Sequence, residues 1–347
     1  MCRLREVVDG AEVWAVVKSD AYGHGSISVG RAASAAGASR LCVATIDEAR
    51  ILRTAMPSVP LIVLSPLAPG EEQSVAEIGC AVTVSTGEGW ERLRDRHDVD
   101  VHVKVDTGMG RWGLSPEAAL AAGAEIAGGP RPERLAGLMS HLATADQEDR
   151  DFVDRQAELF RSVSAAFPPC PRHLANSAAT LRYPDLHFDA VRPGIAVYGI
   201  DPLGIAGSAH GLTPAMRWTS RVDSIRQLAA GDSTGYGRRF IADRDCRVAL
   251  VPIGYADGYP RHLSGLGEVL LGGCRCRVVA TVSMGQFAVL LPHDLVAAAG
   301  DEVALLGADG DDRILAEELA RHVGTIPYEI VCGVRDSRDR ARREQVQ

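Results

Sequence analysis

Residues 14–45 read WAVVKSDAYGHGSISVGRAASAAGASRLCVAT and contain the unit from which the first part of the chain is built. An apolar run at 14–18 leads into glycine-rich loop residues, an alanine-rich stretch with helical character follows, and a second apolar run occupies 41–45. Apolar runs that alternate with helical patterns are typical of βαβ units, in which helices join parallel strands. The stretch therefore predicts one such unit.

The same alternation continues through the first part of the chain. Apolar or β-branched runs fall at residues 14–18, 41–45, 61–65, 81–85, 101–106, 135–141, 172–177 and 191–199. This number of strands favours a closed (β/α)8 TIM-type barrel over an open sheet.

The pattern changes near residues 204–214, which read GIAGSAHGLTP. Beyond them come short strand-like runs separated by glycine and aspartate turns, with one helix-like stretch, RILAEELARHVG. We therefore expect a (β/α)8 barrel over residues 1–210, followed by a separate, mostly β C-terminal domain over residues 211–347.

Composition narrows the functional class. The chain has 347 residues, 46% hydrophobic residues and a net charge of −8, so no basic field for nucleic acid is evident. No apolar segment approaches the roughly 20 residues that span a bilayer. The eight cysteines are scattered, which predicts free thiols in a reducing cytoplasm and no metal site. These features indicate a cytoplasmic protein and argue against a nucleic-acid or membrane partner.

Lys18 ends the first apolar run. In a barrel of this type, the carboxyl ends of the strands carry the chemistry. A lysine there can form a Schiff base if partial desolvation keeps its amine neutral. Position alone favours an ordinary solvated lysine, so the surrounding motifs must decide.

WAVVKSDAYGHG at 14–25 closely resembles the lysine motif of alanine racemases, which are fold-type III pyridoxal 5′-phosphate enzymes. Further blocks that resemble this family follow in its order over nearly the whole chain: VKVDTGMGRWG, SHLATAD, HLANSAA, VRPGIAVYG, GYGRRF, PIGYADGYPR, TVSMGQ and IPYEIVC. The resemblance implies a racemase that interconverts L- and D-alanine, or a closely related amino acid, with pyridoxal 5′-phosphate as cofactor.

The resemblance also implies a two-base mechanism. Lys18 would hold the cofactor and act as the base on one face, and Tyr236 would be the base on the other. A free tyrosine has a pKa near 10, so Tyr236 would need help from neighbouring cations or hydrogen bonds. In the family this tyrosine comes from the partner chain, which implies a homodimer with shared active sites.

Further roles follow by resemblance. Arg192 would face the pyridine nitrogen and, being always protonated, keep that nitrogen unprotonated. His141 would hydrogen-bond Arg192, although it could equally be a core histidine. Ser177 could instead cap a helix, and Tyr328 could be a core aromatic residue. The cofactor-binding set is Lys18, Tyr22, His141, Asn176, Ser177, Arg192, the backbone of Gly194 and Ile195, and Tyr328.

The substrate side of the site is assigned in the same way. Arg111 would lie near the cofactor's phenolic oxygen, and the backbone N–H of Met284 would contact the substrate carboxylate. The lysine equivalent to Lys104 is typically carbamylated in the family, and the same modification here would remove the unfavourable pairing of two buried cations, Lys104 and Arg111. The entryway residues would be Asp146, His173, Tyr255 and Arg261.

The chain also departs from the family pattern. The stretch that precedes the lysine block in the family is absent, so either the start of the sequence is misassigned or a strand that this stretch adds to the β domain is missing. Gly285 stands where the family usually has aspartate, and Thr281 replaces an arginine or similar residue. Losing both charges would widen the mouth of the site, so a different or larger substrate such as serine is an alternative to alanine.

Two other classes are alternatives. A fold-type III decarboxylase would show a glycine-rich phosphate loop and a Cys-Glu motif, neither of which is found, and it leaves GYGRRF unexplained. A non-catalytic cofactor-binding homologue is a lone barrel, which does not account for residues 211–347.

Overall fold

The computed structural model describes residues 1–335 and the backbone of residues 342–345. The chain divides into two compact units, Met1–Val197 and Tyr198–Gln347. The division falls after Val197, and the domain boundary at residue 210 stays a prediction.

The first unit is a closed barrel of eight parallel strands in sequential order. Most strand residues are buried, as expected for parallel strands covered on both faces. The (β/α)8 prediction is confirmed. The strands are β1 Glu12–Val16, β2 Arg40–Val43, β3 Leu61–Val63, β4 Ala81–Val84, β5 Val101–Lys104, β6 Leu135–Met139, β7 Arg172–His173 and β8 Ala190–Val191.

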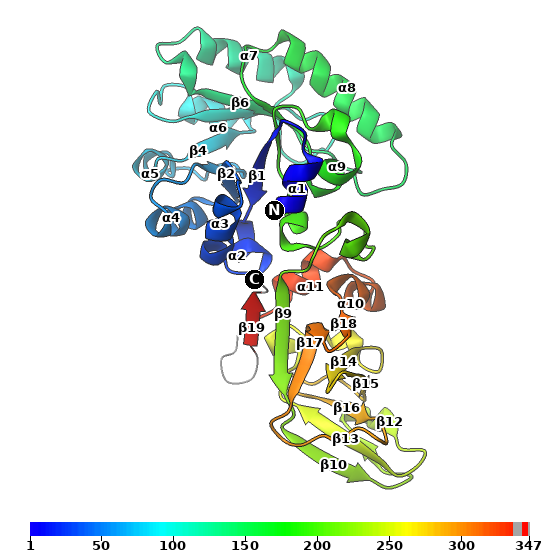
Figure 1. Ribbon diagram of the computed structural model, residues 1–347. Helices are drawn as coiled ribbons and strands as arrows, with labels where there is room; N and C mark the ends of the chain where they lie inside the picture. The colour runs from blue at the N-terminus through cyan, green and yellow to red at the C-terminus, as the bar shows by residue number, and fades with distance from the viewer. Residues whose placement is uncertain (336–341, 346–347) are drawn as a thin grey trace. The chain divides into compact units, whose positions relative to one another are not determined.

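Helices surround this barrel (Figure 1). Several begin at side-chain caps that the sequence supplies: the Thr45 hydroxyl accepts from the Glu48 N–H and the Ser115 hydroxyl accepts from the Ala118 N–H. The helices are α1 Cys2–Val7, α2 Lys18–Tyr22, α3 Ser26–Ala35, α4 Ile46–Ala55, α5 Glu72–Ile78, α6 Gly87–Leu93, α7 Pro116–Ala127, α8 Asp151–Ala166 and α9 Ser177–Arg182. Short 3₁₀ turns lie at η1 Pro132–Arg134, η2 Pro184–Leu186 and η3 Ile195–Tyr198.

The second unit is built on an antiparallel sheet in the order β10-β13-β16-β15-β14-β17-β9-β19, with β18 paired to β17 and a separate β11-β12 pair. The mostly β prediction is confirmed. The strands are β9 Met216–Arg221, β10 Ser224–Leu228, β11 Ser233–Thr234, β12 Phe240–Ile241, β13 Cys246–Val251, β14 Glu268–Leu271, β15 Cys274–Val279, β16 Phe287–Leu291, β17 Glu302–Asp309, β18 Asp312–Ile314 and β19 Arg342–Gln345.

The described residues of this unit include the helices α10 Ala316–Val323 and α11 Pro327–Gly333. Its 3₁₀ turns are η4 Gly207–His210, η5 Tyr236–Arg238, η6 Tyr255–Asp257 and η7 Arg261–Leu263. Leu228, Ala242, Val248, Val279 and Ala288 form a buried apolar cluster in this unit, with Phe240 and Leu290 packed against it.

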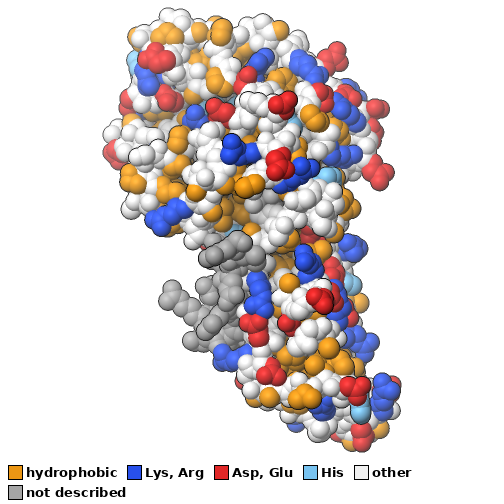
Figure 2. Space-filling model, in the orientation of Figure 1, with side chains coloured by type: hydrophobic (Ala, Val, Ile, Leu, Met, Phe, Trp, Pro, Cys, Tyr) orange, Lys and Arg blue, Asp and Glu red, His pale blue; other side chains and the backbone are white. Residues whose placement is uncertain are grey.

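Within the described part of the chain, no helix combines the length and apolar character needed to cross a membrane. All eight cysteines carry free thiols. Figure 2 shows basic and acidic side chains interspersed over the described residues of the visible face, so this face presents no field of a single sign.

Candidate active site

Lys18 follows β1 and opens a backbone turn of unusual handedness. Ser19, Asp20, Ala21 and Tyr22 all have φ between 50° and 54°, the left-handed region. This conformation costs about 1–2 kcal/mol per non-glycine residue. Strain of this kind persists only where the surroundings enforce it, and it concentrates at functional sites. The sequence pattern predicted only a loop here.

Local hydrogen bonds hold this turn. The Glu48 carboxylate accepts from the N–H of Ser19 at 2.7 Å and from the N–H of Ala44 at 2.7 Å. The Asp20 carboxylate accepts from the N–H of Ser26 at 2.7 Å. The turn therefore fixes the backbone path from Lys18 to Tyr22, whose side chain is buried at 8% exposure.

Tyr22 packs against the backbone at Gly194. A Cβ at Gly194 would lie 2.9 Å from Tyr22 Cζ and closer still to the phenolic oxygen, so only glycine fits. The Ser177 hydroxyl oxygen accepts from the N–H of Gly194 at 2.8 Å and from the N–H of Ala196 at 3.3 Å. With both bonds accepted at oxygen, the Ser177 O–H remains as a donor.

Asn176, not Ser177, caps α9. The Asn176 side-chain oxygen accepts from the N–H of Ala179 at 3.1 Å. This excludes the alternative reading of Ser177 as the helix cap, because Ser177 is the first residue of the helix and its hydroxyl contacts the loop after β8. Tyr22 and Ser177 thus both lie against the backbone at Gly194.

Arg192 is buried and holds four hydrogen bonds through its terminal nitrogens. Nη1 donates to His173 Nδ1 at 2.6 Å and to the His173 carbonyl at 2.7 Å, and Nη2 donates to the carbonyls of Ser140 at 2.6 Å and Leu174 at 3.3 Å. A guanidinium has five N–H donors, so only Nε–H has no partner among the described residues. Burial lowers the pKa of Arg192 to about 10, which still leaves it charged at neutral pH.

Two predictions about histidines need correction. His173, not His141, is the side-chain partner of Arg192 in the described structure. His173 is also fully buried, so it does not line a surface entryway. His141 follows β6 and His173 ends β7, and only the closed barrel decides which one turns toward Arg192.

Several other basic side chains lie near Arg192. Burial, followed by the charges of Arg192 and Arg111, lowers the pKa of Lys104 on β5 to about 8. Burial holds the pKa of His141 well below its usual value, with contributions from Arg192, Lys104, Arg111 and Lys18. The cation cluster, defined as Lys18, Lys104, Arg111 and Arg192, would attract an anionic ligand.

The second unit has a pocket of about 840 Å³ that collects most of the residues expected from this part of the chain. It is lined by Tyr236, Tyr255, Arg261 and Met284, together with Thr281 and Gly285 and with Gly235, Val282, Ser283 and Gln286.

The aromatic and thioether side chains in this pocket are unusually accessible. Tyr236 is 75% exposed and Met284 is 63% exposed. Tyr236, Tyr255 and Arg261 each begin a short 3₁₀ turn. The Thr281 hydroxyl donates to the Tyr236 carbonyl at 3.2 Å, a contact that the sequence did not signal. Tyr328 lies on α11 and does not line this pocket.

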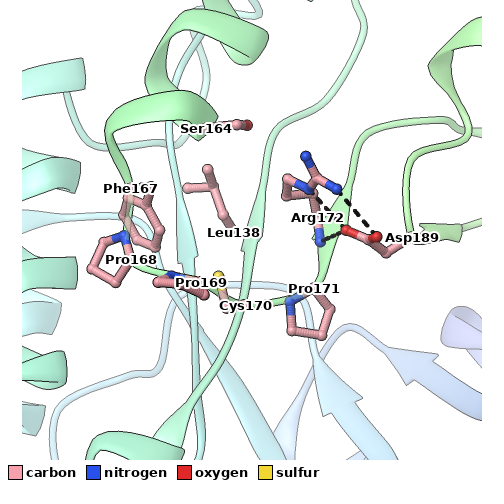
Figure 3. Close-up of a pocket in the computed structure, with 9 residues that line it drawn as sticks. All are labelled: Leu138, Ser164, Phe167, Pro168, Pro169, Cys170, Pro171, Arg172 and Asp189. Carbon is pink, nitrogen blue, oxygen red and sulfur yellow. Dashed lines mark hydrogen bonds and ion pairs between the residues drawn. The ribbon is translucent and has the colours of Figure 1, made fainter.

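Another cavity, of about 470 Å³, lies on the amino-terminal side of β7 and β8 (Figure 3). Phe167, Pro168 and Pro169 form one wall, and the Arg172–Asp189 ion pair closes the other, with Arg172 Nε 2.9 Å from the carboxylate. None of the predicted site residues lines it. In barrels of this type, this end of the strands serves stability rather than chemistry.

Both units match known families. The family model described as alanine racemase, N-terminal domain, covers residues 1–202, and the one described as alanine racemase, C-terminal domain, covers residues 215–342. The chain is 41% identical over 342 residues to an alanine racemase of Symbiobacterium thermophilum, covering 95% of this chain and 90% of that protein. It is also 41% identical to an alanine racemase of Mycobacterium tuberculosis, covering 98% and 92% of the two proteins.

Solved structures give the same result. Alanine racemase from Streptomyces coelicolor A3(2) superposes with a TM-score of 0.89 at 36% identity, over 96% of this chain and 92% of that chain. Alanine racemase from Bacillus anthracis with bound L-Ala-P superposes with a TM-score of 0.84 at 34% identity, over 96% and 90%. The chain therefore belongs to the alanine racemase family.

Proposed function

We propose that this protein interconverts L- and D-alanine with pyridoxal 5′-phosphate as cofactor, by a two-base mechanism that uses Lys18 and Tyr236. The observation that carries the proposal is the placement of Arg192. Its four terminal N–H groups donate to the barrel, so Nε–H is its one remaining donor among the described residues, and Arg192 belongs to the cation cluster.

The residues present fit this cofactor. Its phosphate would meet the Ser177 hydroxyl, Tyr22 and the backbone beside Gly194, where the lack of a Cβ lets the Tyr22 phenol approach the backbone. Its pyridine nitrogen would accept from Arg192 Nε, and Lys18 would hold its aldehyde carbon. Arg111 would contact its phenolic oxygen. Bound there, the cofactor supplies an electron-withdrawing ring that makes the substrate Cα–H acidic.

The chain's own residues would then move the proton. Lys18 would take or return the Cα proton at its Nζ on one face, and Tyr236 would do the same at its phenolic oxygen on the other. The backbone N–H of Met284 would orient the substrate carboxylate. Because Arg192 stays charged and only donates, it would leave the pyridine nitrogen unprotonated, which limits side reactions that need a strongly electron-withdrawing ring.

We also propose a homodimer in which the partner chain supplies Tyr236. Lys18 belongs to the first unit and Tyr236 to the second. Support comes from the exposure of Tyr236, Tyr255 and Met284 within one pocket, since large apolar side chains gathered at a surface are typical of interaction sites.

Lys104 is proposed to carry a carbamate. A lysine attacks carbon dioxide only as the neutral amine, and a pKa of about 8 makes a sizeable neutral fraction available near neutral pH. The ammonium first loses one proton to give this neutral amine, and the nitrogen loses a second proton as the new N–C bond to carbon dioxide forms, so that the two losses together turn a cation into an anion. That anion would pair with Arg111 and relieve the repulsion among the buried cations.

A related candidate is a racemase for a larger or more polar amino acid such as serine. The observation that favours it is the presence of Thr281 and Gly285 in the wall of the 840 Å³ pocket. Neither side chain carries a charge, and Gly285 has no side chain to fill the space.

An α-proton exchange experiment in heavy water tests these proposals together. The wild-type chain, K18A and Y236F would be incubated with alanine, serine, leucine and phenylalanine in both configurations, with exchange and inversion followed by NMR and chiral chromatography. We expect exchange with inversion of alanine in the wild type and loss of inversion in both variants. A clear preference for serine would establish the related candidate instead. Cofactor bound without exchange of any amino acid would overturn the racemase proposal, and release of carbon dioxide would indicate a decarboxylase.

A further inference from the structure

Three buried side chains, Arg192, His173 and His102, form a chain of hydrogen bonds inside the barrel. Arg192, directly after β8, donates from Nη1 to Nδ1 of His173 on β7 at 2.6 Å. The other nitrogen of the same ring, Nε2, lies 3.0 Å from Nδ1 of His102 on β5. Both histidines are 0% exposed, so no solvent contact competes with these bonds.

The chemistry of the three groups settles where each proton lies. A guanidinium can only donate, so Nδ1 of His173 must be the acceptor and carry no proton. The neutral ring of His173 therefore carries its proton on Nε2 and donates it to Nδ1 of His102. His102 in turn must hold its own proton on Nε2. Burial, together with the charges of Arg192 and Arg40, holds the pKa of both histidines well below the usual value, which agrees with two neutral rings.

The surroundings fix the His102 ring in this orientation. His102 pairs across the β5–β6 register with Gly137, and a Cβ at Gly137 would lie 2.5 Å from His102 Nδ1. Trp14 packs edge-on against His102 with the ring centres 5.5 Å apart, and against His173 at 4.4 Å. The absence of a side chain at position 137 thus leaves the space in which His102 presents Nδ1 to His173.

We propose that His102 is a positioning residue for the reaction. By accepting at Nδ1, it holds His173 in the tautomer that can receive Arg192, and so keeps Arg192 Nε–H directed at the ligand. The last step, in which that ligand is the pyridine nitrogen of the cofactor, rests on the function proposed above. The tautomer assignment stands on the hydrogen bonds alone.

Loss of the acceptor at position 102 has a defined consequence. The Nε2–H of His173 would be buried without a partner, as the Nε2–H of His102 already is among the described residues of the wild type. Moving the proton to Nδ1 would relieve that state but would set an N–H against the Arg192 N–H. Arg192 would then have to turn, and its Nε–H would no longer be held in place.

The test uses the full chain with ¹⁵N-labelled histidine and compares H102N with H102L. The side-chain oxygen of asparagine and Nδ1 of histidine are the same number of bonds from Cβ. H102N therefore keeps an acceptor at this position, whereas H102L removes it. We expect the His173 spectrum to show a proton on Nε2 in the wild type and in H102N, and a proton on Nδ1 or a mixture of tautomers in H102L. H173N identifies the resonance.

Cofactor titration provides the second readout. We expect H102L to weaken pyridoxal 5′-phosphate binding by about tenfold, which is the lower end of the range for residues that orient a direct ligand contact. H102N should restore most of the lost affinity. If circular dichroism shows that H102L does not fold, H102F replaces it, since it keeps an aromatic ring beside Trp14.

The outcomes separate the two proposals. An unchanged His173 tautomer in a folded variant without an acceptor would overturn the role of His102. Failure of the wild type to bind pyridoxal 5′-phosphate would overturn the proposed function, while the spectra would still decide whether His102 sets the tautomer of His173.

Discussion

Replacing Gly194 with alanine should destabilise the barrel, and the structure gives the reason. The added Cβ would lie 2.9 Å from Cζ and 3.2 Å from Cε2 of the buried Tyr22 ring, closer than carbon atoms pack. Gly194 has no positive φ, so the backbone accepts alanine and the cost is steric. Forcing an extra methyl into a packed interior costs about 1–3 kcal/mol.

The expected effect can be stated as a melting temperature. The first unit spans Met1–Val197, and for a domain of about this size each kcal/mol shifts Tm by roughly 2–4 °C. G194A should therefore lower the Tm of this unit by roughly 2–12 °C, measured by calorimetry on the full chain.

The matched control is G87A. Gly87 is exposed at the start of α6, has no positive φ, and an added Cβ there would meet nothing within 4 Å. Alanine should leave stability unchanged or raise it by about 0.4–1 kcal/mol through the unfolded chain. Combining G194A with Y22F, which removes the closest atom, should recover part of the loss. If G194A is no more destabilising than G87A, the packing of Tyr22 against this loop is wrong.

Three further predictions concern charge and hydrogen bonding. The pKa of Lys104 is about 8 in the folded chain against an ordinary 10.5, so between these pH values the unfolded chain binds more protons and the unfolding free energy should rise with pH. Urea titrations at several pH values, under carbon dioxide-free conditions, should show this rise in the wild type and a flatter profile in K104M. Equal profiles would contradict the burial of the Lys104 amine. T281V removes the hydroxyl that donates to the Tyr236 carbonyl. Loss of a hydrogen bond worth about 0.5–1.5 kcal/mol should slow α-proton exchange roughly 2- to 12-fold. T281S should restore the rate, and an equally low rate in T281S would show that the hydroxyl is not responsible. S177A leaves the buried N–H of Gly194 without its acceptor and should cost about 1–3 kcal/mol by chemical denaturation; a stability change below about 0.5 kcal/mol would mean that this bond is replaced by another.

Much of the architecture could be predicted from the sequence because its signals are local. Each barrel strand is a short apolar run and each connection carries helix signals, so the strands were recognisable one at a time. The lysine motif placed Lys18 just after β1, where the structure has it. The motifs of the second unit likewise named Tyr236, Tyr255, Arg261 and Met284, which the structure gathers around one pocket.

The alternating sequence of β5, VHVK, also indicates that His102 is an interior residue. Side chains two residues apart in a strand point to the same face, so His102 faces the same way as Lys104. This periodicity could have identified His102 as an interior polar residue, although not its partner.

The sequence by itself determined which residue types are present at the carboxyl ends of the strands, because strand ends follow from local apolar runs and turns. Only the tertiary structure decided which of these residues meet. Arg192 binds His173 rather than His141, and His173 binds His102, 71 positions away in the chain. These pairings depend on how barrel closure sets the register of β5, β6, β7 and β8, and a one-residue difference in register turns a side chain to the opposite face.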